Sequence, residues 1–269
     1  MNTKIKNTIL KSSLSPDGIL KLTLNNPHNH NALSEKMMLN IQSYLDESIK
    51  DNQVRVIIIS SDGPTFSAGH DLKELTSGRK NPDRGRTYFK EIMTKCSKLM
   101  KSIVKNPKPI IAEVSGTATA AGCQLVASCD LAYASKSAKF STPGVNIGLF
   151  CSTPMVAVSR NLSNKHSMEM LLSGELISAD KAESIGLINK AVEDSLLQKY
   201  TFNMALNISK KSAITLKIGK EAFYKQIDMT LSEAYDYASN VMVENMLKLD
   251  AEEGIGAFIN KRKPNWQDK

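Results

Sequence analysis

Two segments of this chain run from a short apolar strand through a loop of small residues into a helix start. The first runs from a strand at 54–60 through Ala68-Gly69 to a helix near Leu72, and the second from a strand at 110–114 to a helix containing Gln124. The first N–H groups of a helix lack partners within it and carry partial positive charge, so they attract anions. Two such junctions that face each other would hold hydrogen-bond donors where negative charge develops on an oxygen atom.

Strand and helix signals alternate along the first 190 residues. An alternating apolar segment at 18–24 predicts a strand, and Ser34 can cap a helix whose apolar residues recur at helical spacing up to Ile49. Short strands are also expected at 131–134 and 138–140. This alternation is typical of an α/β fold with parallel crossovers.

The strand signal ends near residue 195. Apolar residues beyond it recur at helical spacing and predict two or three helices with apolar stripes: Met204, Ile208, Ala213, Leu216, Ile218, Leu231, Tyr235, Ala238, Val241, Met242 and Met246. Such stripes have little sheet of their own to cover. We therefore predict a core at 1–194 and a helical segment at 195–269 that packs on the body and on a neighbouring subunit.

The composition excludes several classes of protein. A hydrophobic content of 41% and a charged content of 23% are ordinary for a globular domain, and no apolar run approaches the roughly 20 residues that span a bilayer. Residues 1–7 lack a secretory apolar segment and are short for an organelle presequence. The four cysteines show neither metal-ligand spacing nor the density of a disulfide framework, which favours a reducing compartment and no metal: Cys96, Cys123, Cys129 and Cys151.

Five segments of the chain resemble the enoyl-CoA hydratase/isomerase (crotonase) family, in the family's order over most of the sequence. They lie at 26–33, 68–73, 116–124, 177–192 and 254–264. The residues at 118–124 and 143–154 are most similar to a little-characterised animal subgroup of this family. The resemblance implies a spiral of repeated ββα units, a C-terminal helical trimerisation segment, and an acyl-CoA thioester as the ligand.

The resemblance also implies roles for individual residues. The two oxyanion donors would be the backbone N–H groups of His70 and Ala121, although the family usually has glycine at the second position. Residues matched to coenzyme-contacting positions are His30, Ala68, Asp71, Leu72, Lys73, Lys261 and Lys263. An ordinary surface-loop histidine remains the alternative for His30. Coenzyme A would be part of the substrate, and no permanently bound cofactor is expected.

The chain departs from the family where its hydratases carry two catalytic glutamates, because these positions are Gln124 and Gly144 here. Each general acid or base contributes about 10² to 10⁴-fold to a rate, so hydration by the family mechanism should be weak. Candidate substitutes lie just beyond. Ser152 falls where dienoyl-CoA isomerases carry an aspartate, and Cys151 falls near the tyrosine of methylmalonyl-CoA decarboxylases. An unreactive buried thiol is the competing interpretation of Cys151.

The net charge of +8 is concentrated in one stretch. Ten basic residues and two acidic ones lie between Arg79 and Lys108. A nucleic-acid surface is one explanation. A solvated helix face that attracts the phosphates of coenzyme A is favoured, because only Tyr88 and Phe89 could stack on bases there.

Three functional classes remain open. The first is an acyl-CoA enzyme with altered chemistry, such as a decarboxylase or another enolate-forming lyase. The second is a hydratase or isomerase of fatty acid metabolism that recruits a nonstandard group, and the third is a non-catalytic acyl-CoA binder or interaction protein. We favour the first. The expected partners are an acyl-CoA thioester and copies of the chain in a homotrimer or dimer of trimers, without membrane or nucleic acid. The expected location is the cytoplasm, or the mitochondrial matrix in a eukaryote.

Overall fold

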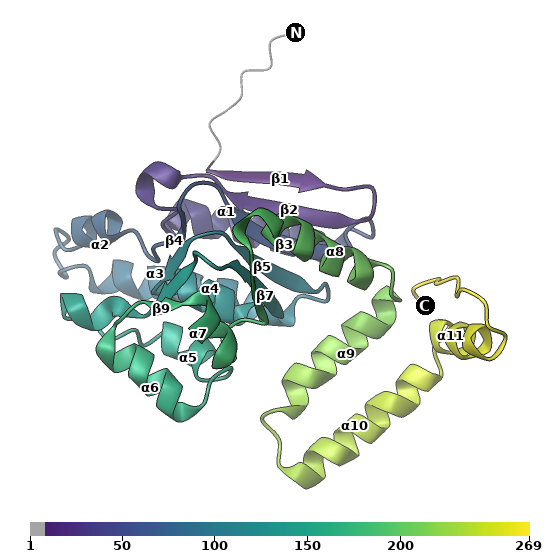
Figure 1. The fold of residues 1–269 in the computed structure, drawn as a ribbon. Coiled ribbons are helices and arrows are strands. Elements are labelled where there is room, and N and C mark those ends of the chain that lie inside the picture. Colours follow the sequence, from purple (N-terminus) through teal and green to yellow (C-terminus); the bar gives the residue numbers. More distant parts are fainter. Residues whose placement is uncertain (1–8) are drawn as a thin grey trace.

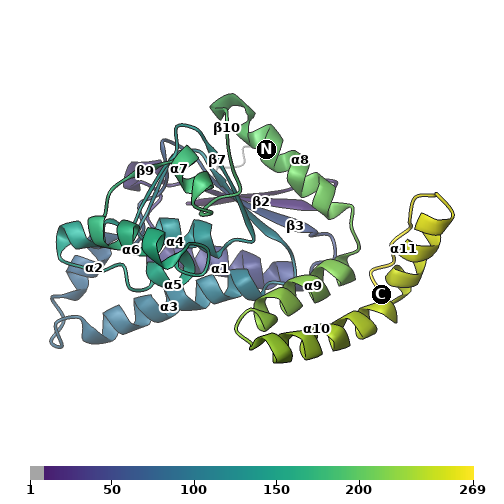
Figure 2. The same ribbon diagram turned by 60° about the horizontal axis from the view of Figure 1, so that its bottom comes forward.

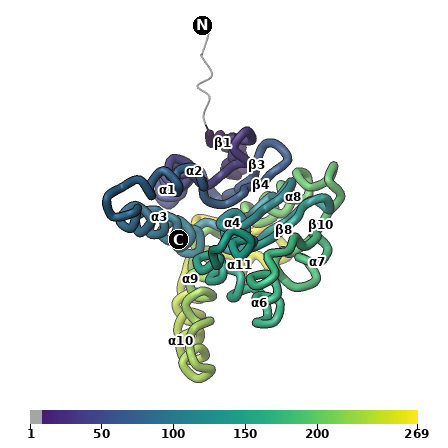
Figure 3. Tube along the Cα trace, turned by 90° about the vertical axis from the view of Figure 1, so that its left-hand side faces the viewer, coloured from purple at the N-terminus to yellow at the C-terminus, as the bar shows by residue number. Residues whose placement is uncertain are grey.

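The computed structural model describes residues 9–269, and the expectation stated for residues 1–7 lies outside this range. The described residues form a body of two β-sheets surrounded by helices, from which a helical arm extends (Figure 1). We define the helical arm as residues 213–259. Figure 2 shows the arm from a second direction, and Figure 3 shows α10 extending well beyond the body.

The larger sheet has six strands in the order β1-β2-β3-β5-β7-β10. Only β1 and β2 are antiparallel; the other neighbours are parallel. The strands are β1 (Leu10–Leu14), β2 (Ile19–Leu24), β3 (Val56–Ser61), β5 (Ile110–Val114), β7 (Leu131–Ser135) and β10 (Lys190–Val192). The sequence analysis missed β1. Only Leu10 of this strand is buried, so the strand lacks the alternation of buried and exposed residues that indicates a half-buried strand.

The second sheet has the order β4-β6-β8-β9 and consists of short strands. These are β4 (Thr65–Ser67), β6 (Thr117–Thr119), β8 (Lys139–Ser141) and β9 (Ile177–Ser178). The strands β4, β6 and β8 each follow one strand of the larger sheet, and helices α2 and α4 then follow β4 and β6. The predicted α/β class with repeated ββα units is confirmed. The repeat brings the ends of β4 and β6 together, since these strands are parallel neighbours.

Seven helices belong to the first part of the described chain: α1 (Glu35–Lys50), α2 (Leu72–Gly78), α3 (Arg86–Lys105), α4 (Ala121–Ser128), α5 (Pro154–Val158), α6 (Asn164–Ser173) and α7 (Ala179–Ser184). The predicted cap of α1 is present, because the Ser34 side chain accepts a hydrogen bond from the Met37 N–H at 3.2 Å. Buried residues of α1 and α3, such as Ile41 and Leu99, belong to the larger apolar core.

Four helices follow residue 195 of the described chain, where two or three were expected: α8 (Leu197–Ser209), α9 (Ala213–Gln226), α10 (Leu231–Met246) and α11 (Leu249–Ile259). Helix α8 packs on the outer face of the larger sheet, where Leu197 and Ala205 join a second apolar cluster with Ile58 and Tyr133. The segment that leaves the body therefore begins with α9.

The helical arm carries a large exposed apolar surface. None of the described residues of α9 or α10 is buried. Apolar side chains of the arm remain largely open, with exposed fractions of 76% for Leu231, 74% for Leu247 and 85% for Phe258. Contiguous exposed apolar surface marks an interaction site in most proteins. None of the described helices combines the length and apolarity needed to cross a bilayer.

Candidate functional site

The first predicted junction connects β4 to α2. Asp71 caps α2, because its Oδ1 atom accepts hydrogen bonds from the N–H groups of Lys73 at 2.9 Å and Glu74 at 3.3 Å. Its Oδ2 atom accepts a hydrogen bond from the Asn29 side chain at 2.6 Å. Gly69 lies just before this helix at φ +86°, a conformation that side chains disfavour. The Leu33 N–H donates to the Gly69 carbonyl at 2.7 Å, which fixes the loop.

The second junction connects β6 to α4, all of whose residues are buried. Ala120 precedes the helix at φ 50° and ψ −120°, which is unusual for a residue with a side chain. Its N–H donates to the Ser141 carbonyl at 3.0 Å, and its carbonyl accepts from the Gln124 N–H at 3.0 Å. Such backbone strain costs about 1–3 kcal/mol and is common at functional sites.

The two junctions are in direct contact. A Cβ atom on Gly69 would lie 2.9 Å from both the backbone nitrogen of Ala121 and the Cβ of Ala120. A Cβ atom on Gly122 would lie 2.2 Å from the Ser67 carbonyl oxygen in β4. Both glycines are therefore required for this approach, since no flexible side chain could move away from the added atom at Gly122.

The contact places two unpaired donors close together. Among the hydrogen bonds of residues 9–269, none is donated by the backbone N–H of His70 or of Ala121. The first precedes the start of α2, and the second belongs to the first residue of α4. The partial charges of helix starts make such N–H groups suitable for an anionic oxygen.

Gln124 lies one turn into α4 and is buried, with 4% of its surface exposed. Its Oε1 atom accepts a weak hydrogen bond from the Cys96 thiol at 3.7 Å. The residue also lines a cavity of about 490 Å³ between α3, α4, α5 and α9. The walls of this cavity include Met100, Val104 and Phe223. Gln124 therefore borders a chamber large enough for a small-molecule group.

Gly144 has no room for a side chain. A Cβ atom there would lie 2.8 Å from the Leu149 carbonyl oxygen and 2.9 Å from the Cys151 Sγ atom. The Gly144 N–H donates to that Sγ atom at 3.4 Å. The cysteine thus fills the space beside Gly144, and a side chain at this position requires a change in the turn.

The thiols near the site are protonated. Burial raises the pKa of Cys151, and the hydrogen bond from Gly144 opposes this shift only in part. Burial also raises the pKa of Cys96 to about 12. Ser152 is exposed, and its hydroxyl donates to the Phe150 carbonyl at 3.4 Å. Neither Cys151 nor Ser152 has a side-chain base within hydrogen-bond distance among the described residues, which leaves both without an activating partner.

The imidazole of His70 is neutral at pH 7, because burial lowers its pKa and the nearby Leu33 carbonyl only partly opposes the shift. Neither ring nitrogen meets hydrogen-bond geometry with any described residue. The side chain therefore offers no charge to the site.

The predicted coenzyme-contacting residues fall into two groups. Those of the first junction lie together: His30, Ala68, Asp71, Leu72 and Lys73. His30 is exposed, and its Nδ1 atom lies 3.4 Å from the Thr65 hydroxyl. Lys261 and Lys263 follow α11, on the opposite side of the molecule from α2 (Figure 1). One chain does not bring the two groups together.

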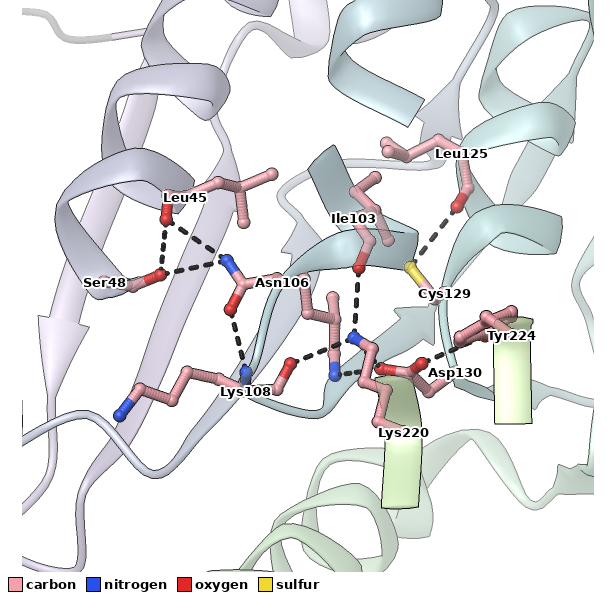
Figure 4. A network of polar contacts seen from close by, with 11 residues as sticks. Leu45, Ser48, Ile103, Asn106, Lys108, Leu125, Cys129, Asp130, Lys220 and Tyr224 are labelled. Atoms are coloured by element: carbon pink, nitrogen blue, oxygen red, sulfur yellow. Dashed lines mark hydrogen bonds and ion pairs between the residues drawn. The ribbon is translucent and has the colours of Figure 1, made fainter. Parts of the chain in front are cut away.

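A polar anchor that the sequence analysis missed attaches α9 to the body (Figure 4). The Lys220 ammonium contacts Asp130 Oδ2 at 2.7 Å and donates to the Ile103 and Lys108 carbonyls at 3.0 and 3.1 Å. The Tyr224 hydroxyl donates to Asp130 Oδ1 at 3.0 Å. Burial raises the pKa of Asp130 and lowers that of Lys220, whereas their mutual attraction opposes both shifts. Asp130 therefore positions α9, which forms one wall of the cavity.

No group of three or more His, Cys, Asp or Glu side chains within residues 9–269 is arranged to hold a metal ion.

Comparison with known proteins agrees with this geometry. The family model described as enoyl-CoA hydratase/isomerase matches residues 15–269. The chain belongs to the enoyl-CoA hydratase/isomerase family. Among curated relatives, enoyl-CoA hydratase domain-containing protein 3, mitochondrial, of Mus musculus is 48% identical over 257 residues, which cover 96% of this chain and 84% of that protein. The Homo sapiens counterpart is 48% identical over 250 residues, covering 93% and 81%.

Solved structures of the family lead to the same conclusion. The crystal structure of human enoyl coenzyme A hydratase domain-containing protein 3 superposes with a TM-score of 0.91 at 46% identity, covering 96% of this chain and 100% of the other. The enoyl-CoA hydratase structure from Mycobacterium smegmatis gives a TM-score of 0.92 at 42% identity, covering 96% and 99%. The predicted family, its fold and the similarity to this animal subgroup are confirmed.

Proposed function

We propose that this family member binds an acyl-CoA thioester and stabilises its enolate with the backbone N–H groups of His70 and Ala121. The observation that carries the proposal is the contact between two helix starts whose unpaired N–H groups lie side by side. Fixed donors in a water-poor site stabilise a developing oxyanion without reorganising during the reaction, and one such donor is worth about 10² to 10³ in rate.

The reaction that fits best takes its electrons from the substrate. In decarboxylation of a 2-carboxyacyl thioester, the bond between Cα and the carboxylate breaks, CO₂ leaves, and the electron pair forms the enolate. A proton from water then reaches Cα. No glutamate is needed to remove a proton, which suits a site with Gln124 and with Cys151 beside Gly144. Another lyase or isomerase reaction through the same enolate is the alternative, and a non-catalytic binder would use only the donors.

The acyl group would extend past Gln124 into the cavity of about 490 Å³. Apolar residues from three helices support this placement: Met100 and Val104 of α3, Val156 of α5, and Phe223 of α9. The Gln124 carboxamide can donate or accept a hydrogen bond there but cannot transfer a proton as a carboxylate does. Its place beside the thioester would orient the acyl group or a water molecule.

The coenzyme would lie along the first junction, where Ala68, Leu72, Lys73 and His30 are exposed and Asp71 fixes the start of α2. A homotrimer, or a dimer of trimers, would supply Lys261 and Lys263 to a neighbouring subunit's site. The exposed apolar surface of the helical arm supports such assembly. We further propose the mitochondrial matrix as the location, because the names of the curated relatives include that organelle.

The experiment is isothermal titration calorimetry with acetyl-, crotonyl- and malonyl-CoA, combined with product analysis by mass spectrometry. The expected result is binding, with CO₂ release from a 2-carboxyacyl thioester. Gly122→Ala should abolish binding, because the new Cβ would meet the Ser67 carbonyl at 2.2 Å. Gly219→Ala is the matched control, since no atom lies within 4 Å of the added Cβ.

The outcomes separate the candidate functions. Absence of affinity for all three thioesters at millimolar concentration would refute the proposal. Binding without any product would favour the non-catalytic binder, and rapid crotonyl-CoA hydration would favour a hydratase with a nonstandard proton-transfer group.

A further inference from the structure

A second cavity lies at the opposite end of the larger sheet from the N–H pair. Its volume is about 420 Å³, and it lies beside the start of β3, the start of α9 and the segment 267–269. Four cationic residues line it: Arg55, Lys108, Lys217 and Lys269. Strand β3 begins at Val56, next to Arg55, and leads away from this cavity toward β4 and the candidate active site.

Lys108 is the central residue of this cavity because it is buried and held in place. Only 9% of its surface is exposed, although the sequence analysis placed it on a solvated helix face. Its backbone N–H donates to Asn106 Oδ1 at 2.9 Å, and its carbonyl accepts from the Lys220 ammonium at 3.1 Å. Figure 4 shows the side chain extending away from this network. The Nζ atom has no hydrogen-bond partner among residues 9–269.

The acidic groups near Lys108 are engaged elsewhere. Asp268 pairs with Arg55 through Oδ2 and accepts a hydrogen bond from the Ala213 N–H at 2.6 Å through Oδ1. Asp51 is exposed and accepts from the Gln53 N–H at 2.8 Å. Burial lowers the pKa of Lys108, the positive charge of Arg55 lowers it further, and Asp268 and Asp51 oppose the shift only in part.

The Lys108 Nζ atom is accessible from the cavity and has no hydrogen-bonded partner, and an anion bound there would offset the repulsion between Lys108, Arg55 and Lys217. Lys217 and Lys269 are exposed, have no ion-pair partner in the described part of the chain, and line the same cavity as Lys108. A phosphate group matches them well, because it carries nearly two negative charges and three acceptor oxygens. The apolar residues Ile214 and Pro109 also line the cavity and suit an organic substituent.

We propose that this cavity is a binding site for phosphate or a phosphate ester, with Lys108 as its principal ligand and Lys217 and Lys269 at its mouth. The site is separate from the proposed thioester site and does not depend on it. Arg55 contributes positive charge while it remains paired with Asp268. The phosphate could come from solution or from a phosphorylated nucleotide such as the one in coenzyme A.

The test is calorimetry on the full-length protein at low ionic strength, with inorganic phosphate and adenosine 3′,5′-bisphosphate as separate probes. We expect at least one probe to bind, and the tighter one identifies the source of the phosphate. Lys108→Met should weaken binding at least tenfold, which equals about 1.4 kcal/mol. Lys108→Arg should retain most of the affinity. Lys165→Met, an exposed lysine of α6 outside this cavity, is the matched control and should bind normally.

A melting experiment in phosphate-free buffer distinguishes a ligand site from a hidden structural ion pair. Lys108→Met should melt at or above the wild-type temperature there, because it removes a positive charge that has no hydrogen-bonded partner and is repelled by Arg55 and Lys217. Equal affinity of wild type and Lys108→Met for both probes would overturn the proposal. A lower melting temperature for Lys108→Met would also overturn it, because it would show that Nζ is already paired in the assembled protein.

Discussion

The packing of Cys151 against Gly144 can be measured with a double-mutant cycle. Gly144→Ala places a Cβ atom 2.8 Å from the Leu149 carbonyl oxygen and 2.9 Å from the Cys151 Sγ atom. Overpacking of this kind typically costs 1–3 kcal/mol, a large part of the roughly 5–15 kcal/mol that stabilises a domain. Cys151→Ala alone removes a buried sulfur and the acceptor of the Gly144 N–H, at a cost of about 1–3 kcal/mol.

The double variant Gly144→Ala/Cys151→Ala should be more stable than the sum of the singles predicts, by about 1 kcal/mol. The new methyl group then occupies the space that the sulfur leaves. Part of the cost should remain, because the Leu149 carbonyl belongs to the backbone and no side-chain change removes it. Urea denaturation followed by circular dichroism measures the three free energies of unfolding, and Gly256→Ala, with no atom within 4 Å of its new Cβ, is the control.

The crowding at Gly144 also limits how hydratase activity could be introduced by mutation. Gln124→Glu alone should recover little crotonyl-CoA hydration, because the second carboxylate is still missing. Gln124→Glu/Gly144→Glu should exceed the sum of the singles only if the turn accepts a side chain, and adding Cys151→Ala should raise the rate further. If Gly144→Ala were neutral, or the cycle strictly additive, Cys151 would not occupy the site of the missing side chain and this reasoning would fail.

Three further predictions concern the whole chain. Lys220→Met should lower the free energy of unfolding by about 3–5 kcal/mol at pH 7, because it leaves Asp130 buried without its cation; urea denaturation measures the loss. Because the fold raises the pKa of Asp130, the contribution of this carboxyl to the free energy of unfolding decreases as pH rises above its pKa in the unfolded chain. The deficit of Lys220→Met should therefore shrink toward pH 4, where the buried carboxyl is protonated and needs no cation. Wild-type hydration of crotonyl-CoA should be about 10⁴-fold below that of an ordinary hydratase in a steady-state assay. Light scattering at micromolar protein should give a trimeric or hexameric mass, and Phe258→Asp should reduce it; a monomeric wild type would contradict the proposed assembly.

Local sequence signals predicted much of the fold and the positions of both junctions. The Ser34 cap, the buried strands and the glycines at 69 and 122 act through neighbouring residues, so their patterns are visible in the chain itself. The strand β1 was missed because four of its five residues face solvent. The number of helices after residue 195 was underestimated, because the short breaks between them interrupt a nearly continuous apolar pattern.

Long-range contacts could not be predicted in this way. Asp130 and Lys220 are 90 positions apart, and neither lies in a motif that indicates the other. Cys151 was a candidate substitute for a catalytic glutamate, but its fit beside Gly144 depends on a turn whose shape only the structure gives. The burial of Lys108 was likewise unexpected, since it follows a helix whose other lysines are exposed or half-buried.

The backbone at Ala120 bears on the choice between an enzyme and a passive binder. A residue at φ 50° and ψ −120° is unfavourable by about 1–3 kcal/mol, and the surrounding hydrogen bonds to Ser141 and from Gln124 hold it there. As a result, the backbone nitrogen of Ala121, the first residue of α4, is held against Gly69 of the neighbouring junction. A protein that only binds coenzyme A gains little from one rigid N–H group, because the nucleotide is large and contacts many other atoms. A reaction through an enolate gains directly, because the donors are already in place when the charge develops. The strained turn therefore supports the proposed reaction through an enolate over the passive binder.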